Sequence, residues 1–278
     1  MDGQREPMDN IQKVALAEFG RQVRSLKWAD IPRAIKLLSV PVLFFGFFMM
    51  GGLYFFFLVA GLFLAWYGII YHKLKTRFWK DFAAARGWVY EEGRTIEGEK
   101  ALLFRQGKHR AITQSVRGEY SGQPLSIFEY QYTIGSGKSK RTLYYTIFEV
   151  TCAGTFPHFF LNNISNGEYL SFGEKMWLPR LTLPDGFEKK FVLYAPKQYE
   201  IEALEIFTPD TLQFLLDTNW PHDLELVDSE IIISCAHHMK GNAELEAELT
   251  NVQTLVNRLA PQLNRMRLTQ IGDYTATL

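Results

Sequence analysis

The clearest pattern in the sequence is an uncharged apolar block over residues 37–71, in a chain that otherwise mixes polar and apolar positions. These 35 residues include no Asp, Glu, Lys, Arg or His. A single helix of that length would measure about 52 Å at ~1.5 Å per residue, whereas a bilayer core is only ~30 Å thick. Two crossings therefore fit better than one. Gly51 and Gly52 supply the turn between them, because glycine readily breaks helices.

Basic residues flank this block on both sides: Arg33 and Lys36 precede it, and Lys73 and Lys75 follow it. A single span is expected to show such a positive excess on its cytoplasmic side only. The sequence therefore predicts a transmembrane helical hairpin over residues 31–72, in a multi-pass membrane protein with both termini in the cytoplasm. One long tilted span is the alternative that stays open.

The segment before the membrane block, residues 1–30, has helical periodicity. Between Asn10 and Trp28 apolar side chains recur at steps of three and four residues, which predicts an amphipathic helix. Its basic side chains would hold it on anionic lipid, or its apolar face would pack on the protein's own soluble domain. The sequence leaves both interpretations open.

A soluble domain is predicted over residues 73–240. The helix that leaves the membrane continues to Gly87, and segments 126–134 and 142–150 then alternate apolar and polar residues, as half-buried antiparallel strands do. A later helix begins at Thr208, whose side chain caps it. The predicted fold class is α+β: a transmembrane helical hairpin, an antiparallel-sheet soluble domain and a C-terminal amphipathic helix.

The last segment, residues 241–278, is a predicted helix with a heptad seam. The apolar positions of this seam are spaced 4-3-4-3-4-3, which is the spacing of a coiled coil. The seam consists of Leu245, Leu249, Val252, Val256, Leu259, Leu263 and Met266. Such a stripe either docks the helix on its own domain or joins copies of the chain into a homo-oligomer, and the sequence does not decide between the two.

Composition narrows the classes of partner and compartment. Lys and Arg number 30, as do Asp and Glu, so the net charge is zero and no basic field points to nucleic acid. The two cysteines, Cys152 and Cys235, are too few for a disulfide scaffold in a chain of 278 residues. We expect two free thiols in a reducing compartment, with a single bridge as the alternative.

The string GSGKS at residues 135–139 resembles the end of a phosphate-binding P-loop. That pattern requires glycine at position 132, which is Tyr132, and alternating strands on both sides predict the tip of a β-hairpin instead. Lys138, Lys140 and Arg141 form a small basic patch on this tip. The patch would contact lipid headgroups or an acidic partner, or it is a solvated turn.

Candidate metal ligands and catalytic residues are few. Cys235, His237 and His238 are the tightest cluster of metal-capable side chains, but zinc usually takes ligands from two separated motifs, and the second is missing. His222 is predicted to be a turn residue because it follows Trp220 and Pro221. No nucleophile elbow or H-E-x-x-H motif appears. The sequence therefore predicts no catalytic, cofactor-binding or metal-binding residues.

Several motifs resemble those of an uncharacterised group of bacterial membrane proteins. They are F-x-x-x-x-G-[WF]-x-Y at Phe82, Gly87, Trp88 and Tyr90, and L-F-x-x-G-x-x-R at Leu103, Phe104, Gly107 and Arg110. Residues 118–132 are similar to the following segment of that group, G-x-Y-x-G-x-P-L-x-[IL]-F-x-Y-x-Y. The resemblance covers about residues 37–235 and implies a two-span hairpin with a cytoplasmic α+β domain. It implies no activity, because none is known for the group.

The leading functional hypothesis is a membrane-anchored, non-enzymatic protein whose cytoplasmic domain binds an unknown protein partner or membrane lipid. It rests on a clear apolar block and on the lack of a catalytic motif in the sequence. The alternative is a membrane-tethered enzyme with a site dispersed in sequence, for which a pocket would gather His158, His222, Cys235 or His237. A third hypothesis is a scaffold that assembles through the C-terminal heptads.

Overall fold

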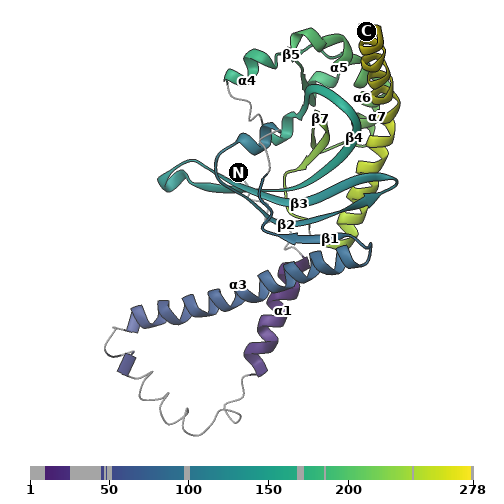
Figure 1. The fold of residues 1–278 in the computed structure, drawn as a ribbon. Helices are drawn as coiled ribbons and strands as arrows, with labels where there is room; N and C mark the ends of the chain where they lie inside the picture. Colours follow the sequence, from purple (N-terminus) through teal and green to yellow (C-terminus); the bar gives the residue numbers. More distant parts are fainter. Residues whose placement is uncertain are drawn as a thin grey trace. The chain divides into compact units, whose positions relative to one another are not determined.

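The computed structural model describes most of the chain (Figure 1). Contacts divide the chain into two compact units, Met1–Phe78 and Trp79–Leu278, each with its own internal contacts. The described residues are 10–25, 45, 46, 48, 52–96, 101–167, 172–184, 186–239 and 241–276.

The first unit contains helix α1 (Asn10–Ser25) and most of helix α3 (Gly52–Ala84). Helix α1 lies within the segment where the sequence predicts an amphipathic helix. The ring of Phe19 in α1 packs edge-on against the rings of Phe63 and Trp66 in α3, with centroids 6.0 Å and 5.4 Å apart. Aromatic side chains thus join the two helices.

Among the described helices, α3 is the one long and apolar enough to cross a membrane. The qualifying stretch is Tyr54–Ala84, and only 6% of its most apolar window is buried. Its large apolar side chains with 45% or more of their surface exposed are Tyr54, Phe56, Phe57, Leu58, Leu62, Leu64 and Ile69. The core helix of a soluble protein would bury most of this surface, so α3 is a candidate membrane span.

The predicted transmembrane hairpin is not confirmed, because the described residues provide one apolar helix and not two. The predicted first span, residues 31–50, lies outside the described part of the chain except for residues 45, 46 and 48. The predicted turn residue Gly51 also lies outside it, whereas Gly52 is the first residue of α3. The second crossing and the multi-pass topology therefore stay predictions.

Helix α3 ends close to the predicted stop at Gly87. The helix continues to Ala84, and Gly87 has a φ of +66°, a backbone conformation that glycine commonly adopts just after a helix. Trp79 and Phe82, near this end, are buried and belong to the second unit. The same helix therefore carries the chain from the first unit into the second.

The second unit is built on a seven-stranded antiparallel sheet, which confirms the predicted α+β fold class. The strand order is β1-β2-β3-β4-β6-β5, and β7 pairs with β4. The strands are β1 (Val89–Glu92), β2 (Lys108–Tyr120), β3 (Gln123–Ile134), β4 (Arg141–Asn163), β5 (Arg180–Leu181), β6 (Phe191–Tyr194) and β7 (Asp223–Cys235).

Strand β4 organises the sheet because its 23 residues pair with three other strands. It pairs with β3 along its first part, with β6 along its last part, and with β7 along both. The β4–β7 register shifts between Thr151 and Phe159, and the paired residue Asp228 has a φ of +53°. Such bulges bend a strand, and Figure 1 shows β4 strongly curved.

Short helices complete the second unit. They are the 3₁₀ turns η2 (Leu102–Arg105), η3 (Gly137–Ser139), η4 (Ile164–Asn166), η5 (Phe187–Lys189) and η6 (Lys197–Tyr199), and the α-helices α4 (Phe172–Trp177), α5 (Glu200–Ile206) and α6 (Pro209–Asp217). Helix α6 begins as predicted, because the Thr208 side chain accepts a hydrogen bond from the backbone N–H of Thr211, at 3.3 Å.

The two faces of the sheet have different cores. One face carries a cluster of buried aromatic and aliphatic side chains that includes Phe128 and Tyr130, and the ring of Phe104 in η2 lies 5.2 Å from that of Tyr130. On the opposite face Phe148 and Ile233 are paired in register and are fully buried. The alternation of side chains along each strand produces this division.

Helix α7 (Asn242–Ala276) docks on its own domain through the heptad seam. It contacts β4, α5 and α6, and Figure 1 shows it running along one side of the sheet. The seam residues Leu245, Leu249, Val252, Val256, Leu259 and Leu263 are each at most 4% exposed, and Met266 is half-buried. This burial favours the docking interpretation, while self-association through the seam stays a prediction.

Candidate functional site

A row of polar side chains crosses the sheet on the face opposite the aromatic cluster. Gln114 of β2, Glu129 of β3, Thr146 of β4 and Cys235 of β7 are successive partners in the strand register. All four are at most 1% exposed. Buried polar groups are costly unless they find hydrogen-bond partners, so the contacts of this row define the candidate site.

Gln114, Glu129 and Thr146 are each paired by a neighbouring group. The Tyr90 hydroxyl lies 2.7 Å from Oε1 of Gln114, and the Thr113 hydroxyl lies 3.3 Å from Oε2 of Glu129. Nδ1 of His238 lies 3.5 Å from Oε1 of the same glutamate. The Thr146 hydroxyl donates to the backbone carbonyl of His237, at 2.9 Å. The row is thus held by contacts within the fold.

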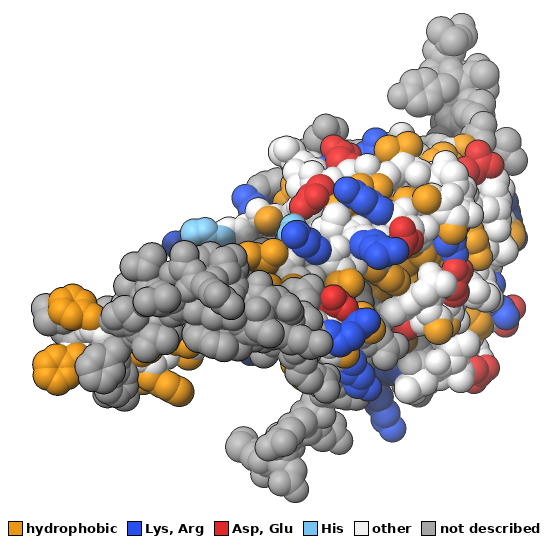
Figure 2. All heavy atoms as spheres, turned by 90° about the horizontal axis from the view of Figure 1, so that it is seen from below, with side chains coloured by type: hydrophobic (Ala, Val, Ile, Leu, Met, Phe, Trp, Pro, Cys, Tyr) orange, Lys and Arg blue, Asp and Glu red, His pale blue; other side chains and the backbone are white. Residues whose placement is uncertain are grey.

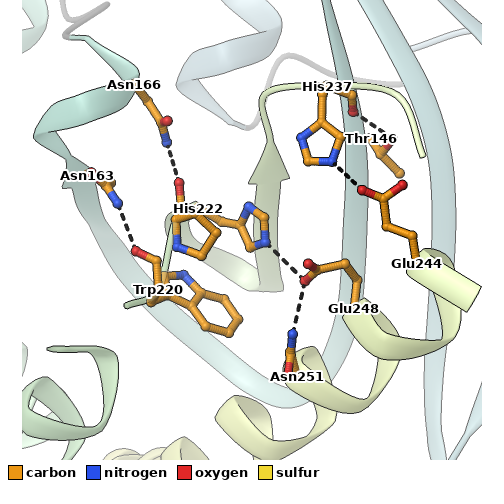
Figure 3. A network of polar contacts seen from close by, with 10 residues as sticks. Thr146, Asn163, Asn166, Trp220, His222, His237, Glu244, Glu248 and Asn251 are labelled. Atoms are coloured by element: carbon orange, nitrogen blue, oxygen red, sulfur yellow. Dashed lines mark hydrogen bonds and ion pairs between the residues drawn. The ribbon is translucent and has the colours of Figure 1, made fainter. Parts of the chain in front are cut away.

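Cys235 belongs to a second cluster, with His222 and Glu248. Nε2 of His222 lies 3.0 Å from Oε2 of Glu248, and one ligand-capable atom from each of the three residues lies within 4.8 Å of the other two. His222 and Cys235 are 2% and 0% exposed. Figure 3 shows His222 pointing toward Glu248 on α7, with the pair His237 and Glu244 nearby.

The bend in the β4–β7 ladder creates this cluster. His222 precedes β7 and Cys235 ends it, so the two are 13 positions apart. A straight strand would hold them about 40 Å apart, at ~3.3 Å per residue. The register shifts and the positive φ of Asp228 curve the ladder and return His222 to the end of the strand.

The surroundings of the cluster set its electrostatics. Burial alone would raise the pKa of Glu248, but the hydrogen bonds with His222 and Asn251 and the electrostatic effect of His222 and His237 together outweigh it, so the net effect is a lowered pKa. Burial raises the pKa of Cys235 well above its ordinary value, and the carboxylates of Glu248 and Glu244 add to this effect. These shifts favour a neutral thiol at Cys235 beside a charged carboxylate at Glu248.

Asp223, next to His222, anchors the loop after β4. Its Oδ1 accepts hydrogen bonds from the backbone N–H of Asn163 at 2.7 Å and from the side-chain amides of Asn162 and Asn166 at 3.1 Å and 3.2 Å. Burial raises the pKa of Asp223 to about 6, and these hydrogen bonds limit the rise. The side-chain amide of Asn163 also donates to the carbonyl of Trp220, at 2.8 Å (Figure 3).

Two further histidines face glutamates. His158 of β4 contacts Glu225 of β7, whose Oε1 also accepts the backbone N–H of Leu102, at 2.8 Å. His237 lies 3.2 Å from Glu244, in a more exposed pair. Of the side chains that an enzyme pocket would gather, the structure thus brings His222 and Cys235 together and pairs His158 and His237 with separate glutamates.

The structure shows the surroundings of the metal-capable side chains that the sequence singled out. Cys235, His237 and His238 are close in sequence but lie beside different groups. Cys235 lies near His222 and Glu248, His237 faces Glu244, and His238 faces Glu129. His222 is a buried member of a polar cluster and not simply a turn residue. The sequence contains a pattern that could have pointed to Glu248. Glu244 and Glu248 lie one helical turn apart, next to the apolar seam of the predicted helix.

The predicted basic patch lies at the tip of a β-hairpin. Turn η3 joins β3 to β4, so residues 135–139 connect two strands and not the strand and helix that a P-loop joins. Lys138, Lys140 and Arg141 are all exposed. Their role in binding stays a prediction.

No family model matches this sequence, and no curated protein matches it. A solved structure with some likeness is the crystal structure of the mycobacterial trehalose monomycolate transport factor A, TtfA. The two chains are 10% identical, with a TM-score of 0.48, and the alignment covers 68% of this chain and 93% of the other. A likeness at this level carries no argument about function, and the resemblance to the bacterial membrane-protein group stays an expectation.

Proposed function

We propose that this protein is a membrane-anchored, non-enzymatic protein whose α+β domain binds at the bilayer surface. The observation that carries the proposal is the uncovered apolar surface of α3, of which only 6% is buried in its most apolar window. Water would penalise this surface by about 25 cal/mol for each Å², whereas lipid does not. The helix therefore anchors the chain, and the domain that follows is held close to the membrane.

The use of the histidines supports binding over catalysis. Four of the six histidines in the chain contact a glutamate within the fold. The pairs are His158 with Glu225, His222 with Glu248, His237 with Glu244 and His238 with Glu129. Pairs that are satisfied in this way stabilise a fold, and a general acid or base would have to turn from its partner toward a substrate.

The hairpin tip supplies the surface that we assign to lipid headgroups. Lys138, Lys140 and Arg141 are exposed on one short turn, and a basic side chain near an anionic membrane contributes about 1 kcal/mol. The face of the molecule in Figure 2 shows basic and acidic side chains interspersed. Because the net charge is zero, headgroup contact requires a local basic cluster, and this tip is such a cluster.

Membrane extraction tests the anchor. The full-length chain should stay in the membrane pellet after alkaline carbonate treatment. A variant with both Leu58→Lys and Leu62→Lys should be released, because each lysine costs about 2.5–3.5 kcal/mol at the centre of a membrane helix. Val89→Lys is the matched control, since Val89 is 70% exposed on β1, outside the apolar helix. Release of the wild-type chain, or its dispersal without detergent, would overturn the proposal.

Hydrogen exchange tests the tip. The full-length chain would be placed in nanodiscs of zwitterionic lipid alone or with added anionic lipid. We expect residues 135–141 to gain protection with anionic lipid, and the gain to disappear when Lys138, Lys140 and Arg141 are all replaced by Gln. Equal exchange in both lipids would refute headgroup contact and leave an acidic protein as the partner to seek.

A further inference from the structure

We propose that His222, Cys235 and Glu248 bind a zinc ion that fastens helix α7 to the sheet. The three ligand-capable atoms already lie within 4.8 Å of one another. They come from three places in the chain: the residue before β7, the last residue of β7 and the second turn of α7. This inference does not depend on the proposed membrane function.

The distances suit zinc after a small adjustment. Zinc binds sulfur at about 2.3 Å and nitrogen or oxygen at about 2.0–2.2 Å, so ligand atoms in a tetrahedral site are about 3.3–3.7 Å apart. The His222 and Glu248 atoms are 3.0 Å apart, and no pair in the cluster exceeds 4.8 Å. The flexible side chain of Glu248 can make the adjustment, because two of its torsions lie beyond Cβ. Water fills the fourth position.

The ligand chemistry selects the metal. An imidazole nitrogen, a thiolate and a carboxylate form a mixed set, which zinc accepts and which magnesium and calcium do not favour, because those ions prefer oxygen ligands alone. Neighbouring side chains contact two of the three ligands and would hold them in orientation. The Asn251 amide lies 3.4 Å from Oε2 of Glu248, and the rings of Trp220 and His222 are 5.3 Å apart, edge to face.

The site explains why a cysteine, a histidine and a glutamate converge in a place that apolar residues could fill. Cys235 is fully buried, and its neighbours include two glutamates. A zinc ion held by these three residues would tie both ends of β7 to α7. The bound ion would thereby cross-link the strand and the helix.

Cobalt uptake tests the site. The full-length protein, purified in detergent and treated with a chelator, would be titrated with CoCl₂ and in parallel with ZnCl₂. We expect one cobalt ion per chain and a thiolate-to-cobalt charge-transfer band in the near ultraviolet, which zinc then displaces. Cys235→Ser should lose the band, while Cys152→Ser should keep it, because Cys152 is not part of the cluster.

The wild-type protein alone can overturn the proposal. If the chelator-treated chain keeps its circular-dichroism spectrum but takes up neither cobalt nor zinc, His222 and Glu248 are only a buried hydrogen-bonded pair beside a core thiol. A band that survives Cys235→Ser would also refute the assignment. Should Cys235→Ser fold poorly, Glu248→Ala serves as the second variant, which should keep the thiolate band and bind cobalt at least tenfold more weakly.

Discussion

Nε2 of His222 lies 3.0 Å from Oε2 of Glu248, although 26 residues separate the two in sequence. The contact joins the start of β7 to the N-terminal part of α7, and both side chains are largely removed from water, with 2% and 17% of their surfaces exposed. Together with the buried heptad seam, this contact holds the C-terminal helix on the sheet. A polar pair and an apolar stripe therefore perform the same structural task.

Replacing Glu248 by Ala should destabilise the domain more than the same change one turn earlier. Glu248→Ala leaves the buried His222 imidazole without its partner, at a cost of about 1–3 kcal/mol. Glu244→Ala is the matched control, because Glu244 pairs with His237 in contact with solvent, and should cost less than about 1 kcal/mol. Denaturant unfolding in excess chelator measures both. Equal losses would show that burial of the pair contributes nothing.

Asp223→Ala should be among the most destabilising single changes at an acidic position. It removes the acceptor of two buried donors, from Asn162 and Asn163, and of one half-buried donor, from Asn166, and should lower the free energy of unfolding by about 3 kcal/mol. Glu205→Ala, at an exposed position in α5, should change it by less than about 0.5 kcal/mol. The expectation is contradicted if the two variants unfold at the same denaturant concentration.

Gly118→Ala tests the packing of Trp88 on β2. A Cβ at position 118 would lie 2.2 Å from the Trp88 indole, which also donates to the carbonyl of Glu119, at 3.2 Å. The overlap should cost about 1–3 kcal/mol in thermal or denaturant unfolding. In a Trp88→Ala background the same substitution should cost little, because the clashing ring is gone. An undiminished cost in that background would place the strain elsewhere.

The reactivity of Cys152 should depend on pH in a way set by its burial. Burial raises the pKa of this thiol from 9.0 to about 11, so the folded chain keeps the proton to a higher pH than the unfolded chain does. Alkylation by iodoacetamide at pH 8 should be at least about tenfold slower in the folded protein than in guanidinium. Its rate should rise up to about pH 11, as followed by peptide mass spectrometry.

The same shift has a consequence for stability. Because the native state binds the Cys152 proton more tightly, the contribution of this group is fully present below pH 9 and is lost as pH rises toward 11. A folded-state alkylation rate that levels off near pH 9 would contradict both expectations. Cys152→Ser is the control, since it should remove the alkylation signal and this part of the pH dependence.

Some contacts link positions that the sequence alone singled out without explaining. Trp88 and Gly118 both belong to the motifs that resemble the bacterial membrane-protein group, and the structure packs one directly on the other. Cys235 and His237 are near neighbours in sequence, but the strand ends at Cys235 and the chain turns there. Cys235 lies close to His222 and Glu248, and His237, beyond the end of the strand, faces Glu244.

By itself the sequence determined the elements whose signal is local. The length of apolar chain marks α3, alternation marks β3 and β4, Thr208 marks the start of α6, and the heptad spacing marks the buried side of α7. Only the tertiary structure decided which polar side chains meet. His222 reaches Cys235 through the bend of a 13-residue strand, and Glu248 reaches both through the docking of α7. Such contacts depend on where distant segments of chain are brought together, and hydrophobic periodicity determines the face a residue occupies but not its partner across the fold.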